Sequence, residues 1–181
     1  MKKKYLQERV DSYKDFPKKG IIFRDLSPIF SDPNLLAELI KEMSNIQFCK
    51  NADAIIAVDA RGFLFGSMIS MYLSKPMVLA RKPGKLPGEL ISKEYSLEYG
   101  TNSLSLQKKA IQQYNSFAIV DDIIATGGTV QCLYELILSQ NKEVTGLNVV
   151  LELAELKGRD KFPFPVSSQL IYLFYCKIDE L

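Results

Sequence analysis

The chain has 181 residues, 47% of them hydrophobic and 24% charged, a balance typical of a globular protein with a substantial core rather than a disordered, fibrous or membrane chain. Its formal net charge of +2 is too small to indicate a nucleic-acid partner, and no apolar run approaches the ~18 residues of a membrane span. The sequence contains no histidine, which excludes imidazole bases, histidine-activated nucleophiles and histidine-ligated metals within this chain.

The cysteines and the N-terminus indicate a reducing compartment. Cys49, Cys132 and Cys176 are widely spaced and form no CxxC pair, so we expect buried thiols rather than a disulfide framework or a zinc site. Residues 1–13 begin with a basic cluster but continue with polar residues instead of the apolar segment that an export signal needs. We therefore expect a cytoplasmic protein.

The N-terminal part is expected to contain two helices separated by a short strand. Three apolar residues at helical spacing predict a short first helix packed on the rest of the chain: Leu6, Val10 and Tyr13. A turn-rich segment and a strand at residues 21–23 follow. Asp32 and Pro33 then have the chemistry of a helix start, and helical apolar spacing continues to Met43.

From residue 54 onward, apolar strands alternate with helices. Strands are expected at 54–58, 77–80, 117–120 and 146–153, and helices at 63–73 and after residue 129. This alternation is typical of a mostly parallel α/β sheet with helices on both faces. Residues 82–105 are rich in proline and glycine with little apolar periodicity, so we expect a long loop, which is usually functional or mobile.

The segment at residues 119–129, IVDDIIATGGT, carries the strongest functional signal. It joins a buried strand to a periodic helix, so its small residues and the helix N-terminus can surround a phosphate with N–H donors. Asp121 and Asp122 come just upstream, where carboxylates could accept hydrogen bonds from the hydroxyls of a phosphorylated ribose. The structural alternative is a glycine-rich turn whose acids only cap the strand. The segment is neither a Walker A loop nor a GxGxxG motif.

The same segment resembles the phosphoribosyl-diphosphate motif of type I phosphoribosyltransferases, and its context resembles the adenine-specific branch of that family. Five further blocks occur in the family's order: IIFRDLSPIFSDP, VDARGFLFG, RKPGKLPGE, YSLEYG and ELKGR. The resemblance implies a single domain over residues 1–181, with an α/β fold in which a mostly parallel twisted sheet is flanked by helices. It also implies a small N-terminal hood region within residues 1–30, for base recognition, and a long flexible catalytic loop at residues 82–105.

The resemblance implies a reaction in which adenine and phosphoribosyl diphosphate give AMP and diphosphate, a step of purine salvage. Displacement at an anomeric carbon has oxocarbenium-like character, so the site must stabilise a cationic sugar and an anionic leaving group. Mg²⁺ held mainly by the diphosphate and ribose would serve the second need, with Asp59 in contact through water rather than as a strong ligand. The implied partners are these small molecules and a second copy in a homodimer, with neither nucleic acid nor membrane.

The resemblance also assigns residues to the ribose, its 5′-phosphate and its diphosphate. The 5′-phosphate would lie in the loop formed by Ala125, Thr126, Gly127, Gly128 and Thr129. Asp121 and Asp122 match the ribose-contacting acids. The diphosphate would lie against a strand-end turn and nearby basic residues: Asp59, Ala60, Arg61, Arg81 and Lys85. RKPGK alone would indicate a solvated basic turn, but its place directly after a strand in this ordered set favours function.

Base recognition and proton transfer are implied in two other segments. Phe23 and Ile123 would sandwich the purine, while the backbone around Ile22 and Arg24 reads its edge; the alternative for Phe23 is an ordinary core position. The catalytic group would comprise Glu98, Tyr99 and Arg61. Glu98 would accept the proton that adenine loses and Tyr99 would order the closed loop, whereas a solvated glutamate on a mobile loop is the alternative.

Two other functions remain open on the sequence. The first is the same fold acting on another purine such as xanthine, since base contacts made by the backbone leave little trace in a sequence. The second is a non-catalytic regulator that senses phosphoribosyl diphosphate and binds nucleic acid. Such a regulator would need an added DNA-binding segment or a large basic face, for which the charge of +2 gives no support.

Overall fold

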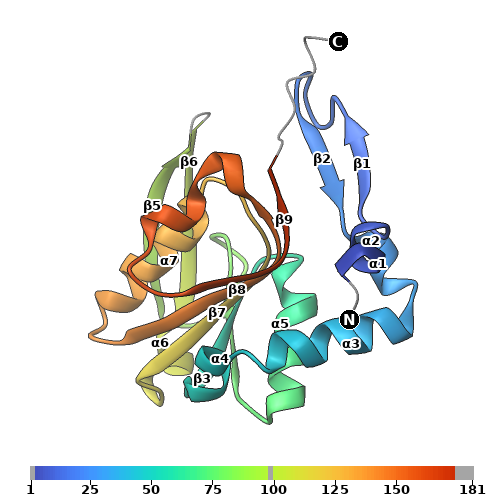
Figure 1. Ribbon diagram of the computed structural model, residues 1–181. Helices are drawn as coiled ribbons and strands as arrows, with labels where there is room; N and C mark the ends of the chain where they lie inside the picture. The colour runs from blue at the N-terminus through green and yellow to red at the C-terminus, as the bar shows by residue number, and fades with distance from the viewer. Residues whose placement is uncertain (1–2, 98–99, 174–181) are drawn as a thin grey trace.

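The computed structural model of the chain describes residues 3–97 and 100–173, and its centre is a five-stranded parallel sheet (Figure 1). The strand order is β4–β3–β7–β8–β9, and every neighbouring pair is parallel. The strands are β3 Ala54–Val58, β4 Met77–Ala80, β7 Ser116–Ile124, β8 Glu143–Leu153 and β9 Val166–Tyr172. The mostly parallel sheet expected from the alternating pattern is therefore confirmed.

Helices cover both faces of this sheet and bury an apolar core on each side. The helices α3 Pro33–Ser44, α4 Gln47–Asn51 and α5 Gly62–Leu73 contribute to one core. The helices α6 Lys108–Gln112 and α7 Gly128–Leu138 contribute to the other. All five residues of β3 are buried, which explains why this strand is a continuous apolar run rather than an alternating one.

The start of α3 follows the expected capping chemistry. The side chain of Asp32 accepts a hydrogen bond from the backbone N–H of Leu35 at 3.1 Å, and Pro33 occupies the first helical position. The apolar periodicity places one face of the helix in the core, including Leu39 and Met43 with no exposed surface. Local sequence therefore predicted this element correctly.

The N-terminal segment forms a small hairpin region at the edge of the molecule. Helix α1 is Lys3–Gln7, and strands β1 Asp11–Lys14 and β2 Ile22–Asp25 pair antiparallel before the short helix α2 Ser27–Phe30. Tyr13 was expected on the first helix, and this is wrong: it lies on β1 opposite Phe23 and is 52% exposed. The helix ends early because pairing with β2 satisfies the backbone that a longer helix would have satisfied.

Much of the segment expected as a long loop is an antiparallel hairpin. Strands β5 Leu90–Leu97 and β6 Gly100–Gln107 pair with each other, and their base joins the edge of the central sheet where Arg81 and Ser105 exchange two backbone hydrogen bonds. Leu104 and Leu106 are buried in the core beside α7. This period-two pair of leucines is the strand signal that the proline and glycine content concealed.

The chain between β8 and β9 contains two short 3₁₀ turns, η1 Ala154–Leu156 and η2 Gly158–Lys161. Of Cys49, Cys132 and Cys176, the first two are free and buried, and the third lies outside the described residues. Burial raises the pKa of the Cys49 thiol to about 11, so it is inert at neutral pH.

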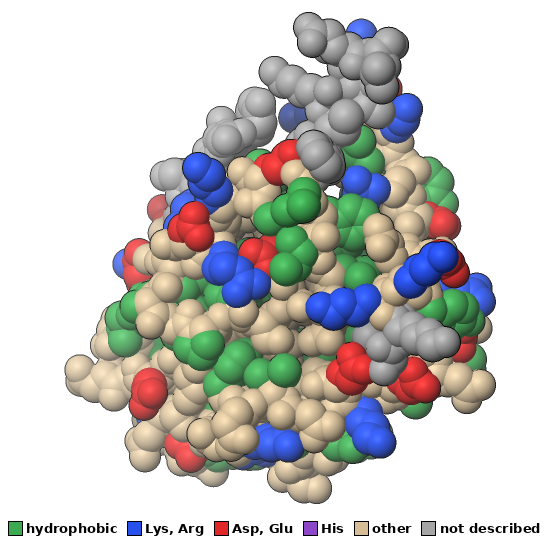
Figure 2. Space-filling model, viewed as in Figure 1, with side chains coloured by type: hydrophobic (Ala, Val, Ile, Leu, Met, Phe, Trp, Pro, Cys, Tyr) green, Lys and Arg blue, Asp and Glu red, His purple; other side chains and the backbone are tan. Residues whose placement is uncertain are grey.

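The surface carries charges of both signs close together. Figure 2 shows Lys and Arg side chains interspersed with Asp and Glu on the viewed face rather than gathered into one large basic patch. Within residues 3–97 and 100–173, no helix has both the length and the apolar character needed to cross a membrane.

Candidate active site

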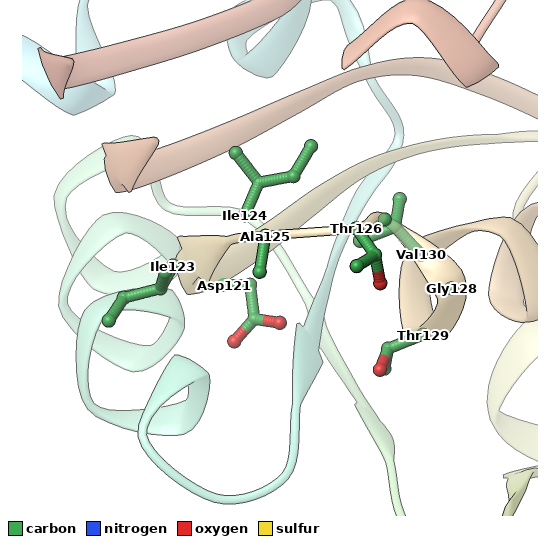
Figure 3. Close-up of a pocket in the computed structure, with 9 residues that line it drawn as sticks. Asp121, Ile123, Ile124, Ala125, Thr126, Gly128, Thr129 and Val130 are labelled. Carbon is green, nitrogen blue, oxygen red and sulfur yellow. The ribbon is translucent and has the colours of Figure 1, made fainter. Parts of the chain in front are cut away.

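A pocket of about 110 Å³ lies at the carboxyl end of β7, where the chain turns into α7. Its lining consists of Asp121 and residues 123–130 (Figure 3). Figure 3 shows the side chains of Asp121 and Thr129 on the same side of the loop, and that of Ile124 on the opposite side. A bound water needs ~10–15 Å³ by this measure, so the pocket has room for the few heavy atoms of a phosphate group.

The backbone around this pocket is arranged to bind an anion. Gly127 precedes α7 with φ +78°, a left-handed conformation that glycine adopts without steric cost. The N–H groups in the first turn of a helix have no intrahelical partner, and the helix dipole favours negative charge there. The residues of that turn, Gly128, Thr129 and Val130, bring no acidic group. The loop and the start of α7 therefore form a pocket whose N–H groups could bind an anion.

Two carboxylates lie beside the loop, and they belong to the strand itself. Asp121 and Asp122 were expected after the end of the strand, but β7 continues through both of them to Ile124. They are only 9% and 7% exposed, and the N–H of Asp122 donates a hydrogen bond to Oδ1 of Asp121 at 2.8 Å. Burial, and secondly the adjacent Asp122, raise the pKa of Asp121 well above its ordinary value. Asp121 is thus held in an environment that disfavours its ionised form.

Arg61 joins these acids to the N-terminal region. Its Nε lies 2.5 Å from Oδ2 of Asp122, and its guanidinium lies over the ring of Phe23 at 5.2 Å from the centroid. Arg61 directly precedes α5, whose first residue is Gly62. A Cβ atom on Gly62 would lie only 2.8 Å from Oδ1 of Asp121, so glycine is needed for this helix to start so close to β7.

A second polar cluster lies at the ends of β3 and β4. Nε of Arg81 is 3.1 Å from Oδ2 of Asp59, and its Nη1 donates to the backbone carbonyl of Lys85 at 3.3 Å. The guanidinium also lies over the ring of Phe63 at 5.6 Å. The Asp59–Ala60 peptide bond is cis. The structure therefore brings together Asp59, Arg81 and the turn that contains Lys85, whose side chain is exposed.

The segments expected to bind the base lie near the same edge of the sheet. Phe23 is half-buried on β2 and contacts the edge of Phe16 at 5.2 Å between ring centroids, so it is not an ordinary core position. Among the described residues β2 pairs only with β1, which leaves the backbone of Ile22 and Arg24 on a strand with one open edge. Ile123 is partly buried and lines the pocket.

Two of the residues expected to take part in catalysis cannot be compared with the structure. Glu98 and Tyr99 lie outside the described residues. The described backbone of β5 ends at Leu97, and that of β6 begins at Gly100.

Sequence reasoning missed one contact of the loop. Gly158, in the ELKGR block, packs so closely that a Cβ atom there would lie 2.2 Å from the carbonyl oxygen of Ala125. The glycine in that block was the available signal, but its neighbour is 33 positions away in the chain and no local pattern identifies it.

Several known proteins are similar to this chain in sequence and in fold. The model of the family described as "Phosphoribosyl transferase domain" matches residues 27–174. An adenine phosphoribosyltransferase of Prochlorococcus marinus (strain MIT 9211) is 56% identical over 172 residues, covering 95% of this chain and 100% of the relative. A crystal structure of the adenine phosphoribosyltransferase of Thermoanaerobacter pseudethanolicus is 37% identical with a TM-score of 0.88, covering 94% of this chain and 99% of that one. The Saccharomyces cerevisiae enzyme, complexed with an imino-altritol bisphosphate and adenine, is 37% identical with a TM-score of 0.83, covering 93% and 99%.

Proposed function

The chain belongs to the phosphoribosyltransferase family, and we propose that its site transfers the phosphoribosyl group of phosphoribosyl diphosphate to adenine. The products are AMP and diphosphate, so the protein is a pentosyltransferase of purine salvage. A ring nitrogen of adenine forms the new bond to the anomeric carbon, the bond from that carbon to the diphosphate oxygen breaks, and adenine loses one proton.

The observation that carries this proposal is the phosphate-sized pocket beside two buried carboxylates. The pocket supplies helix N-terminal donors for a 5′-phosphate, and Asp121 and Asp122 lie next to it along β7. Two ionisable carboxylates in a buried position stabilise positive charge, which develops on the sugar in an oxocarbenium-like transition state. A glycine-rich turn with a purely structural role does not require two buried acids, and burial of Asp121 disfavours its ionised form.

The diphosphate leaving group is assigned to the cluster at the ends of β3 and β4. The assigned residues are Asp59, Ala60, Arg61, Arg81 and Lys85. The guanidinium of Arg81 is held in place by Asp59, and a fixed guanidinium can bind a phosphate through two parallel hydrogen bonds. The exposed ammonium of Lys85 adds a positive charge nearby.

The base is assigned to the open edge of β2 and to the ring of Phe23. Backbone groups of Ile22 and Arg24 would read the purine edge, and Ile123 would supply the second apolar surface. This assignment is supported by the contact of Arg61 with both Phe23 and Asp122, which links β2 to the acids assigned to the sugar.

Mg²⁺ fits this donor set as a companion of the substrate. The candidate donors of the chain are carboxylate oxygens, the ligands that Mg²⁺ prefers, and Asp59 is the one beside the assigned diphosphate cluster. Within residues 3–97 and 100–173, no three Cys, Asp or Glu residues are grouped as a metal site. The ion would be held mainly by the diphosphate and ribose oxygens of the substrate, with Asp59 in contact through water, and would neutralise charge on the leaving group.

We also propose a homodimer in the cytoplasm. Three apolar side chains of α5 are exposed and could pack against a second copy: Leu64 at 47%, Met71 at 78% and Tyr72 at 51%. Light scattering during size-exclusion chromatography will give the mass in solution, and a mass of 20.5 kDa would contradict the dimer.

The activity is tested by measuring diphosphate release with phosphoribosyl diphosphate and each of four bases, with and without Mg²⁺. We expect release with adenine, and at least about 100-fold lower kcat/KM with hypoxanthine, guanine or xanthine, because a backbone edge complementary to adenine leaves buried polar groups unpaired with a 6-oxopurine. A preference for a 6-oxopurine would overturn the adenine assignment, and absence of release with every base would overturn transfer itself.

Glu98 is expected to act in proton transfer. The change Glu98→Gln should lower kcat by about 100-fold while changing KM for either substrate by less than about threefold, because general-base catalysis contributes typically 10²–10⁴ to the rate and little to binding. Glu94→Gln on β5 is the control, since it removes an exposed carboxylate from the same hairpin. An unchanged kcat in Glu98→Gln would remove this residue from the mechanism.

A further inference from the structure

The phosphate loop is in direct contact with a turn from the C-terminal part of the chain. A Cβ atom on Gly158 would lie 2.2 Å from the carbonyl oxygen of Ala125 and 2.9 Å from the nitrogen of Gly127. In the opposite direction, a Cβ atom on Gly127 would lie 2.9 Å from the carbonyl oxygen of Gly158 and 3.0 Å from Cζ of Phe162. Two glycine backbones therefore pack against each other, with no room for a side chain on either.

The turn that carries Gly158 is anchored by its next residue. The Nε of Arg159 donates to Oε1 of Glu152 at 2.8 Å, its Nη2 donates to Oε2 of the same carboxylate, and its Nη1 donates to the carbonyl of Val166 at 2.6 Å. Ser168 completes the set by donating to Oε2 of Glu152 at 2.7 Å. The guanidinium thus ties the turn to both β8 and β9.

Glu152, the carboxylate that binds Arg159, belongs to strand β8 of the central sheet. Glu152 is 5% exposed, and in the parallel pairing of β7 with β8 it lies opposite Ile124, the last residue of β7 before the loop. The hydrogen bonds from Arg159 hold the pKa of Glu152 below its ordinary value, so the carboxylate is ionised at neutral pH. The loop is accordingly bordered on one side by its own strand and on the other by a turn clamped to the neighbouring strands.

We propose that Gly158 and Arg159 position the 5′-phosphate loop, so that the anchor formed by Arg159, Glu152 and Ser168 sets the affinity for the phosphorylated sugar without touching it. The proposal rests on the function proposed above, because it concerns the same pocket. Gly158 acts by close approach to the loop and Arg159 by keeping Gly158 there. The hydrogen bonds of Arg159 go to β8 and β9, and the nearest atoms to Gly158 belong to the loop, so adenine binding should not depend on them.

The first test is the variant Gly158→Ala, assayed for steady-state kinetics and for binding of ribose 5-phosphate by calorimetry. We expect the dissociation constant of ribose 5-phosphate and the KM for phosphoribosyl diphosphate to rise by about 100-fold, since a displacement near 1 Å in a site can cost that much. The KM for adenine, measured at saturating phosphoribosyl diphosphate, should stay within about twofold.

Gly146→Ala is the matched control. A Cβ atom at Gly146, on β8, would lie 2.6 Å from ring carbons of Phe48, so alanine there also creates a clash, with a side chain and away from the pocket. This variant should lose thermal stability as Gly158→Ala does, yet retain the wild-type affinity for ribose 5-phosphate. An equal loss of affinity in both variants would mean that general destabilisation is the cause and would overturn the proposal.

If Gly158→Ala does not fold, two more conservative variants test the positioning role. Arg159→Lys keeps the charge but loses the fork that binds both oxygens of Glu152, and Glu152→Gln weakens the same contact from the other side. Each should raise the dissociation constant of ribose 5-phosphate by about 10-fold, with adenine KM unchanged. If both variants keep the wild-type affinity for ribose 5-phosphate, or if their KM for adenine rises in parallel, the positioning role is overturned. The proposed function still stands in that case, provided that the wild-type protein is active. Failure of the wild-type protein to bind ribose 5-phosphate or release diphosphate would instead overturn the proposed function.

Discussion

Replacing Gly127 by alanine is expected to lower kcat/KM for phosphoribosyl diphosphate by about 100-fold or more. Two effects act together. The residue has φ +78°, which costs an alanine of the order of 1 kcal/mol. The new Cβ would also lie 2.9 Å from the carbonyl oxygen of Gly158 and 3.0 Å from the ring of Phe162, so the loop must move. Because this loop would supply the N–H donors of the proposed phosphate pocket, its movement should remove the binding geometry.

The two effects can be separated with a second glycine. Gly88 has φ +83° with no neighbour within 4 Å of an added Cβ, so Gly88→Ala reports the backbone strain alone. We expect a larger loss in the free energy of unfolding for Gly127→Ala than for Gly88→Ala, measured by urea denaturation. Equal losses, together with wild-type kcat/KM in Gly127→Ala, would show that the loop does not depend on this contact.

Replacing Asp121 by asparagine is expected to make the protein more stable and less active. Burial raises the pKa of Asp121, so the folded protein disfavours the ionised carboxylate that the unfolded chain carries at neutral pH. Asparagine removes this cost and keeps an oxygen that can accept the 2.8 Å hydrogen bond from the N–H of Asp122. We expect Tm to rise by several degrees at pH 7–8, since about 1 kcal/mol shifts Tm by ~2–4 °C in a protein of this size. We also expect kcat/KM to fall by about 10- to 100-fold, the value of a lost hydrogen bond to a charged group.

The stabilisation expected from Asp121→Asn depends on pH. A carboxyl group whose pKa is raised by folding contributes its full stability below its ordinary pKa of 3.8, and that stability is lost as the pH rises through the folded value. The Tm advantage of Asp121→Asn should therefore be present at pH 7–8 and absent near pH 4. A Tm below that of the wild type at pH 7–8 would contradict this account.

Asp53 provides a control of opposite sign. Hydrogen bonds from the backbone N–H groups of Asn115 and Ser116, at 2.9 and 3.0 Å, lower the pKa of this exposed carboxyl. The change Asp53→Asn should lower Tm at neutral pH, where the ionised carboxylate is stabilising, and should leave kcat/KM unchanged. The contrast between the two aspartates separates a carboxylate kept for function from one kept for stability.

Sequence alone determined the local elements of this protein and the chemistry of its loop. The apolar run of β3, the capped start of α3 and the small residues before α7 are each specified within about ten neighbouring residues, where helical or strand periodicity and glycine conformation act directly. The alternation of these elements was sufficient to predict a parallel sheet. The IVDDIIATGGT segment predicted a phosphate loop for the same local reason.

Tertiary structure alone decided which residues meet. β3 lies beside β7 in the sheet, and this order brings Arg61 to within 2.5 Å of Asp122 and over the ring of Phe23. The packing of Gly158 on Ala125 likewise depends on how the chain returns after β8. Such contacts join residues that are distant along the chain, and their geometry follows from strand order and helix packing. Periodicity carries no information about strand order, so the partners of the phosphate loop became visible only in the folded chain.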